Sequence, residues 1–258
     1  MITTFIKGML CLWMLVLLPA LSYAEVPSGH YENHFDTQYG VWDLTGTYDD
    51  ADIGFPSDIT ITQDNKGKIS GQGAVAGSQD GFTADVDFTI SGSIKSLGDV
   101  TRVTLKTKIG GTATDGSQVW DIKGKFTLTG DVDKSTGSLI GRAKGKLCVE
   151  GEGCFPIDEA TELELPAEAD GSWDLFLDIQ NVDGKKLIGT GSAFLQNGNG
   201  IREVPFTLKG KYNAGTDLAT LKLKGSGGSF AIQAYATTFE LIFQSIKGKM
   251  LGQTVNFP

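Results

Sequence analysis

The sequence contains few of the side chains that most often carry catalysis. It has two histidines and three cysteines among 258 residues. His30 and His34 lie in an N-terminal stretch without hydrophobic periodicity, so a Ser-His-Asp or Cys-His centre would need this stretch to be held against the fold. Together with Asp36 they offer metal ligands only on an ordered helical turn, and nothing in the sequence caps such a turn. We therefore expect that the protein is not an enzyme.

Positive charge is also in deficit. The chain carries 22 lysines and arginines against 31 aspartates and glutamates, a net charge of −9 at pH 7. A net negative charge repels phosphate-rich surfaces, so it argues against nucleic acid and anionic membrane surfaces as partners.

Long apolar runs are missing outside the N-terminus. Met9–Leu18 is apolar but too short to span a bilayer comfortably, and Lys7 precedes it. Small residues at Ser22 and Ala24 then provide the positions that a signal peptidase recognises. These features predict that residues 1–24 are a cleaved signal peptide and that the mature protein is periplasmic or secreted.

Cysteine usage agrees with export. Only Cys148 and Cys154 remain after the predicted cleavage, and two glycines lie between them. Exported proteins meet an oxidising environment, and no third or fourth soft metal ligand lies nearby. The pair is predicted to form a disulfide.

The chain contains an internal duplication. Ile59–Gly111 aligns without a gap with Leu177–Ser229, 118 positions later, and 12 of the 53 aligned positions are identical. Within both copies apolar and polar residues alternate, which is typical of strands with one buried face, and Gly- and Asn-containing turns separate the runs. We expect the two copies to form the same strands in the same order.

The predicted fold is all-β, an internally duplicated antiparallel meander of two similar barrel-like or strongly curved half-sheets with about six strands each. The residues expected to point inward are Phe88, Ile90, Leu105, Phe206, Leu208 and Leu223. The lysines expected to point into water are Lys106, Lys108, Lys209, Lys211, Lys222 and Lys224.

Composition divides the mature chain into four parts. Residues 25–38 lack periodicity and are predicted to be a flexible arm, and residues 39–154 form the first β repeat. Residues 155–170 are acidic and contain no glycine, so they are predicted to be a connector. Residues 171–258 form the second β repeat.

Three tryptophans are candidate ligand-binding residues. Trp42, Trp120 and Trp173 can line a pocket or stack on a sugar. They can equally anchor a core, and the recurrence of Trp42 as Trp173 in the Trp-Asp-Leu tripeptide favours the core.

One turn is a candidate calcium site, and calcium is the only cofactor that the sequence suggests. Asp131, Asp133 and Ser135 place oxygen groups at alternate positions, as at the start of a calcium loop. Arg142 stands where such a loop needs a bidentate glutamate, and the flanks look like strands. A plain hairpin turn explains the same residues.

The C-terminal segment Gly252–Phe257 resembles the terminal strand of outer-membrane barrels, with alternating apolar residues that end in an aromatic. It departs from that pattern at Pro258 and Met250. The resemblance implies an outer-membrane barrel of about twelve strands as an alternative.

The leading functional hypothesis is an exported, non-enzymatic protein that binds an apolar small molecule inside a barrel, or a cell-envelope partner on the sheet surface. Membrane insertion is the first alternative and is not favoured. An extracellular hydrolase with an acidic pair that the sequence does not locate is the second.

Overall fold

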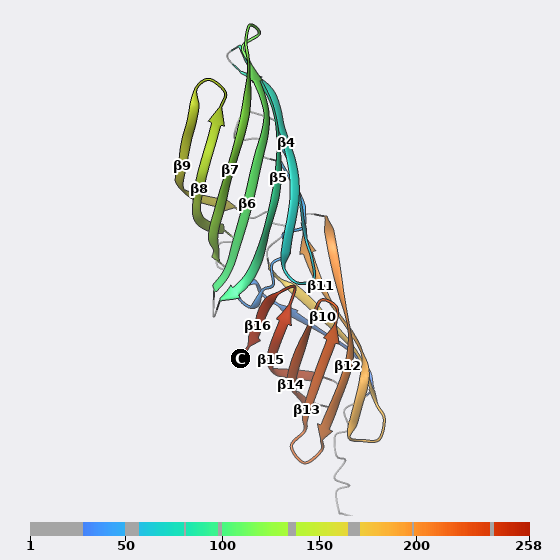
Figure 1. Cartoon of the computed structure of the whole chain (residues 1–258). Helices are drawn as coiled ribbons and strands as arrows, with labels where there is room; N and C mark the ends of the chain where they lie inside the picture. The colour runs from blue at the N-terminus through green and yellow to red at the C-terminus, as the bar shows by residue number, and fades with distance from the viewer. Residues whose placement is uncertain are drawn as a thin grey trace, which may run out of the picture.

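The computed structural model describes residues 28–49, 57–79, 81–97, 100–133, 138–164, 171–197, 199–237 and 240–258. The predicted signal peptide lies outside them. Sixteen strands and one short 3-10 turn, η1 (Thr37–Tyr39), make up the secondary structure of these residues. None of their helices is long and apolar enough to cross a membrane. The all-β, duplicated antiparallel meander is confirmed (Figure 1).

The first sheet has eight antiparallel strands in sequence order. Its strands are β2 (Gly46–Asp49), β3 (Ser57–Gln63), β4 (Lys68–Gln79), β5 (Phe82–Leu97), β6 (Val100–Thr114), β7 (Val119–Asp133), β8 (Ser138–Val149) and β9 (Gly153–Glu164).

The second sheet also has eight strands, and the N-terminal strand is added to one edge. Its strands are β1 (Gly29–Phe35), β10 (Trp173–Asn181), β11 (Lys186–Asn197), β12 (Gly200–Asn213), β13 (Leu218–Gly225), β14 (Gly228–Ala236), β15 (Leu241–Met250) and β16 (Gln253–Phe257).

Three sequence expectations need correction. Each sheet has eight strands rather than about six. Residues 25–38 are not simply a flexible arm, because Gly29–Phe35 pairs with β10 and buries Tyr31 and Phe35 against the second sheet. Residues 155–170 are not simply a connector, because they begin inside β9, which pairs with β8 along its whole length. Both edge strands carry many polar residues that face water, which weakens their apolar periodicity.

The duplication is preserved in the strand pairing, with one change. Ile90 pairs with Gly71 in the first copy, as Leu208 pairs with Gly189 in the second. In the next hairpin Ile90 lies opposite Thr107, whereas Leu208 lies opposite Leu223, a shift of two residues. Because two is the side-chain period of a strand, the shift leaves every side chain on the same face.

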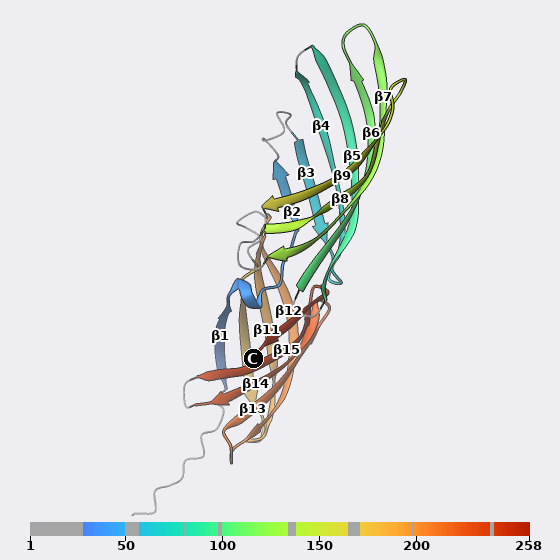
Figure 2. The same cartoon turned by 90° about the vertical axis from the view of Figure 1, so that its left-hand side faces the viewer.

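Glycines at matched positions let neighbouring strands approach closely. A Cβ atom at Gly92 would lie 2.1 Å from the carbonyl oxygen of Thr104, and one at Gly210 would lie 2.7 Å from that of Thr220. Only glycine fits such positions without a shift of the backbone, so these glycines permit the strong curvature of both sheets (Figure 2).

Aromatic contacts close the second sheet around its core. The ring of Phe35 on β1 stacks on Trp173 of β10 at 4.2 Å between centroids. It also meets Phe257 of β16 edge-on at 5.7 Å. The two edge strands of the sheet therefore meet through one phenylalanine, and the inner face is sealed.

A buried polar cluster joins the two sheets at the extended segment before β2. The Trp42 N–H donates to Gln253 Oε1 at 3.0 Å, and Gln253 Nε2 donates back to the Trp42 carbonyl at 2.6 Å. The buried carboxylate of Asp43 accepts hydrogen bonds from Arg202 at 2.9 Å and Asn197 at 3.0 Å. From the first sheet, Gln63 Oε1 of β3 accepts a hydrogen bond from the Leu44 N–H at 3.0 Å, so residues from both sheets hold one short segment in place.

Candidate ligand-binding site

The structure separates the three candidate tryptophans. Trp42 and Trp173 are each 1% exposed and belong to the packed core, one at the junction and one in the second sheet. Trp120 is half-buried on the inner face of the first sheet, where its ring lies 6.0 Å from that of Phe82. Only Trp120 therefore lies where a ligand could reach it.

The predicted calcium turn is part of a strand pair. Asp131 lies in β7, opposite Arg102 of β6, which donates two hydrogen bonds to it at 2.7 and 2.8 Å. These bonds hold the pKa of the Asp131 carboxyl below its ordinary value. Asp133 is the last residue of β7, and Ser135 lies outside the described residues. No group of three or more histidine, cysteine or acidic side chains that could hold a metal ion occurs in the part of the chain that the structure describes.

The histidines are held on the sheet as surface His–Asp pairs. His30 Nδ1 lies 2.8 Å from Asp178 Oδ1, and His34 Nδ1 lies 2.7 Å from Asp174 Oδ1. Each aspartate is directly opposite its histidine in the β1–β10 register. Strand pairing alone therefore explains both contacts.

The first of these pairs borders a shallow hollow of about 440 Å³ on the outer face of the second sheet. Ser192 lines the same hollow, but its hydroxyl donates to Glu203 Oε1 at 2.5 Å rather than to a histidine. A serine nucleophile needs its base within hydrogen-bond reach, so these residues do not form a catalytic triad as they stand.

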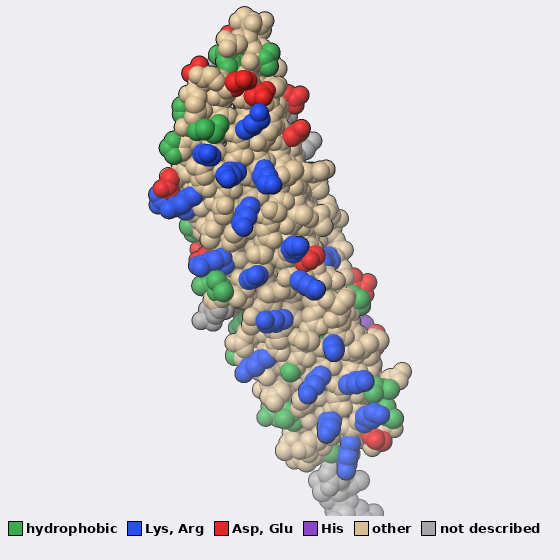
Figure 3. Space-filling model, in the orientation of Figure 1, with side chains coloured by type: hydrophobic (Ala, Val, Ile, Leu, Met, Phe, Trp, Pro, Cys, Tyr) green, Lys and Arg blue, Asp and Glu red, His purple; other side chains and the backbone are tan. Residues whose placement is uncertain are grey.

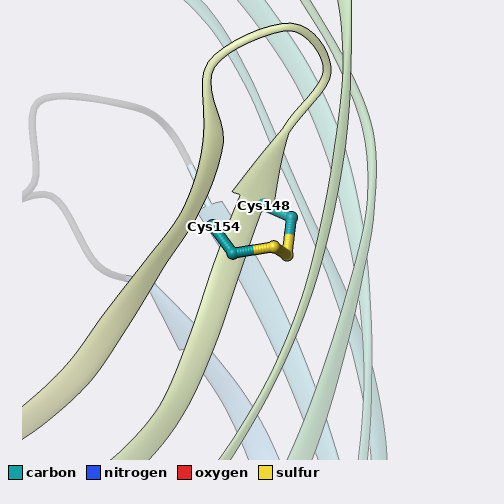
Figure 4. The surroundings of a disulfide bond; sticks show 2 residues. All are labelled: Cys148 and Cys154. Carbon is teal, nitrogen blue, oxygen red and sulfur yellow. A yellow bond between two sulfur atoms is a disulfide. The ribbon is translucent and has the colours of Figure 1, made fainter.

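The predicted disulfide is confirmed. Cys148 and Cys154 face each other across the β8–β9 hairpin, at the rim of the first sheet (Figure 4). The bridge joins strands that are already paired, so it fixes the end of this edge hairpin.

The inner face of the first sheet is apolar, and within the part of the chain that the structure describes only its base is covered. Near the second sheet, Ile94 and Val103 are fully buried, and Trp42 and Leu44 from the junction segment pack with them. Farther from the second sheet, most of the large inward side chains of β5 to β9 are half-buried. These residues are Val86, Phe88, Ile90, Ile109, Trp120, Ile122, Phe126, Leu147 and Ile157. We call this set the open apolar face.

Strand length explains why the junction segment covers only the base of the inner face of the first sheet. The central strands β5, β6 and β7 have 16, 15 and 15 residues, whereas β13 and β14 in the second sheet have 8 and 9. The long strands run past the junction segment, away from the second sheet (Figures 1 and 2). Their outer halves carry the open apolar face.

Matched positions of the duplication make the difference plain. Phe206, Leu208 and Leu223 in the second sheet are 4%, 2% and 1% exposed. Their counterparts Phe88, Ile90 and Leu105 point to the inner face of the first sheet but are only half-buried. The predicted inward direction holds for all six, and the two faces differ in what covers them.

The open apolar face has almost no charge. Glu159, opposite Ala143 on the edge strand β9, is the one acidic or basic side chain on this face within the described ranges. Large side chains and glycines are mixed across the strands. One cross-strand row from β5 to β8 reads Phe88, Ile109, Gly124 and Leu147. Such a surface suits hydrocarbon, because exposed apolar area is costly in water and few polar groups on the face need hydrogen-bond partners.

Comparisons of the chain with protein-family models, with curated proteins and with solved structures find no match. The site therefore rests on its own geometry. Sequence reasoning predicted the direction of these side chains but not their exposure. The only available signal was the greater length of the alternating runs in the first copy.

Proposed function

We propose that the open apolar face binds the hydrocarbon part of an apolar or amphiphilic small molecule. The supporting observation is the contrast between matched residues, because the second copy shows that this strand order can seal its inner face. The first copy leaves Phe88 and its neighbours only half-buried instead. A contiguous exposed apolar surface on a soluble chain typically marks an interaction site.

In the second sheet, Phe35 of β1 and Phe257 of β16 form an apolar layer over the inner face. In the first sheet the bound ligand would form this layer. Phe126 and Ile90 lie directly opposite Thr107 on its two neighbouring strands. An alkyl chain over these residues would remove their remaining apolar surface from water, at roughly 25 cal/mol for each Å². The protein needs no metal or cofactor for this role.

The test is the titration of the full chain with a fluorescent fatty acid, followed by energy transfer from Trp120. The variant Phe88→Gln/Ile109→Gln changes two residues that lie directly opposite each other on β5 and β6. We expect it to weaken binding at least about tenfold, because it places two amides under the ligand. Native mass spectrometry of protein from its own host would show a retained ligand directly.

The matched control is Tyr235→Gln/Ile242→Gln, a cross-strand aromatic–isoleucine pair on the outer face of the second sheet. Both residues are exposed, at 46% and 47%. Equal loss of binding in the control variant would contradict the proposal. A dimer that the Phe88→Gln/Ile109→Gln variant cannot form would also contradict the proposal. The occupant of the face would then be a second copy of the chain, not a small molecule.

We further infer that the protein works outside the cytoplasm, in the periplasm or the medium. The disulfide supports this compartment, because such bonds persist in oxidising environments. Fractionation of the native host tests it, and a mature N-terminus at Glu25 in the soluble fraction is the expected result. Recovery in the outer-membrane fraction would favour the alternative.

A further inference from the structure

The outer faces of both sheets carry lysines in a regular pattern. Six Lys-x-Lys pairs occur on six strands, three pairs in each sheet, and all twelve side chains are exposed. The pairs are Lys106/Lys108, Lys123/Lys125, Lys144/Lys146, Lys209/Lys211, Lys222/Lys224 and Lys247/Lys249. They hold twelve of the 22 lysines and arginines of a chain whose net charge is −9. We call this surface the lysine face.

One view of the molecule shows the lysine face along nearly its whole length (Figure 3). Acidic side chains in that view gather mainly at the margins. Two of the twelve lysines have a carboxylate within 4.0 Å in the described residues, Lys123 with Asp121 and Lys144 with Asp158. The acidic net charge therefore does not describe this surface, which is locally cationic.

The lysines form rows across the strands. Lys108, Lys125 and Lys146 lie directly opposite one another on β6, β7 and β8. Lys209 and Lys222 lie opposite each other on β12 and β13. Neighbouring strands are about 4.8 Å apart, and like charges at that distance destabilise a sheet. A pattern that costs stability and recurs in both sheets points to a function in binding anions.

The surroundings of the rows indicate which anion fits. The cross-strand neighbours of the lysines are mostly small or polar, such as Thr89, Thr127, Thr220 and Ser229. None of these neighbours is aromatic in the described strands. Nucleic acids bound as single strands rely on aromatic side chains for base stacking, so this face lacks their usual partner.

The shape of the face favours a flexible chain over a flat surface. The sheets are bent (Figure 2). The lysines alternate along the strands with the inward apolar residues, so they lie on the outer, convex side. A flat bilayer would meet only part of a convex face, and electrostatic attraction falls off within about 10 Å at 0.1 M salt. A flexible polymer can follow the curve and meet both rows of lysines.

We propose that the lysine face binds a linear acidic polysaccharide, whose carboxylate or sulfate groups pair with the lysine rows. Lysine presents a point charge with rotatable donors, which suits a repeating anion without a fixed bidentate geometry. Binding is electrostatic and reversible by salt. It leaves the open apolar face free, because the two faces lie on opposite sides of the first sheet.

The experiment measures retention of the full disulfide-bonded chain on immobilised heparin and on immobilised polygalacturonate, with dextran as the neutral control. We expect retention on both acidic polymers at low salt, none on dextran, and a steep loss of affinity as salt rises. The sulfated and carboxylated arms show which anion the face prefers.

The variant Lys108→Gln/Lys125→Gln removes one cross-strand pair. We expect it to weaken binding roughly tenfold at low salt and to reduce the salt dependence, because fewer ion contacts form. The matched control, Lys66→Gln/Lys185→Gln, removes the same charge from two exposed lysines in turns. It should bind nearly as the parent does.

A second measurement excludes loss by misfolding. Without polymer, the Lys108→Gln/Lys125→Gln variant should melt at or above the parent temperature, because a like-charge pair is gone. Absence of retention on either acidic polymer at low salt, or equal loss in both variants, would overturn the proposal. Tighter binding to single-stranded DNA or to anionic vesicles than to either polysaccharide would also overturn it.

Discussion

The two sheets share a duplicated segment of 53 aligned positions, yet among the described residues only the second sheet has a sealed inner face. In the second sheet Phe35 of β1 contacts Trp173 on one side and Phe257 on the other, so the edges of the sheet meet. In the first sheet the junction segment around Trp42 covers the base, and the longer central strands continue beyond it. The difference shows that the duplicated strands set the direction of side chains, whereas added segments decide whether an inner face becomes a core.

A duplicated protein can gain a binding site when one copy keeps the packed core and the other exposes its apolar face. The second sheet supplies a sealed unit with a large aromatic core, and the first is attached to it by contacts that include the ion pair between Arg202 and the buried Asp43. The first copy can then expose apolar surface without losing its attachment. Four predictions test this division, in order of decreasing effect.

The largest expected effect is at the matched phenylalanines. Phe206→Ala removes a ring from the sealed core and should cost roughly 3–5 kcal/mol. Phe88→Ala, at the equivalent position in the first sheet, should cost only about 1–2 kcal/mol, because its ring is only half-buried in the folded state. Hydrogen exchange with mass spectrometry measures the opening free energy of each sheet separately. Similar costs at both sites would mean that the first sheet is as well covered as the second.

The next effect concerns the junction. Arg202→Met leaves the carboxylate of Asp43, whose side chain is 0% exposed, without its ion partner. We expect a loss of roughly 2–3 kcal/mol, below the usual cost for a fully buried pair because Arg202 itself is 21% exposed. Denaturant unfolding followed by intrinsic fluorescence measures it, and the two sheets should then unfold less cooperatively.

Arg102→Met is the control for the junction variant. It breaks the Arg102–Asp131 pair, whose side chains are 44% and 41% exposed, so its effect should be small. If both variants lose the same stability, the buried position of Asp43 is not what holds the sheets together.

A smaller and more local effect is expected at the disulfide. Cys148→Ser/Cys154→Ser removes a bridge between residues with a sequence separation of only 6. For so short a loop, the loop-entropy model gives a loss of about 2 kcal/mol in the free energy of unfolding. We expect faster hydrogen exchange in β8 and β9 and unchanged exchange in β13 and β14. Loss of soluble, folded protein would show that the rim bridge supports the whole first sheet.

The smallest effect is a difference in acid sensitivity. Hydrogen bonds from Arg102 lower the pKa of Asp131, and hydrogen bonds from Arg142 lower the pKa of Asp158, both between strands of the first sheet. A carboxyl whose folded pKa lies below its unfolded value of about 3.9 stabilises the fold above that pH. This contribution is lost as the pH falls through the folded pKa.

The first sheet should therefore lose more stability between pH 5 and pH 3 than the second, where the backbone amides of Lys186 and Lys185 lower the pKa of the turn residue Asp183. Denaturation midpoints or exchange rates at the two pH values measure this difference. Asp131→Asn should flatten the response of the first sheet. An unchanged response would mean that the Asp131 pair contributes nothing to it.

Several features of the fold could be predicted from local sequence alone. Alternation with a period of two predicted that Phe206 and Leu208 point inward and that Lys209 points outward, and the structure confirms this. The disulfide followed from its short spacing and is confirmed. The two-residue register shift after β12 could not be predicted, because it depends on a turn in which Asp217 adopts a positive φ of 51°.

The amino-acid sequence by itself determined the strands within the two aligned copies, their order and the polarity of their two faces, because these depend on neighbours along the chain or one hairpin away. Only the tertiary structure decided which inner face is sealed. That outcome depends on β1 reaching β10, about 140 positions later, and on Phe35 meeting Phe257. Local periodicity carries no information about such contacts, so the exposure of the open apolar face became evident only once the two sheets were assembled.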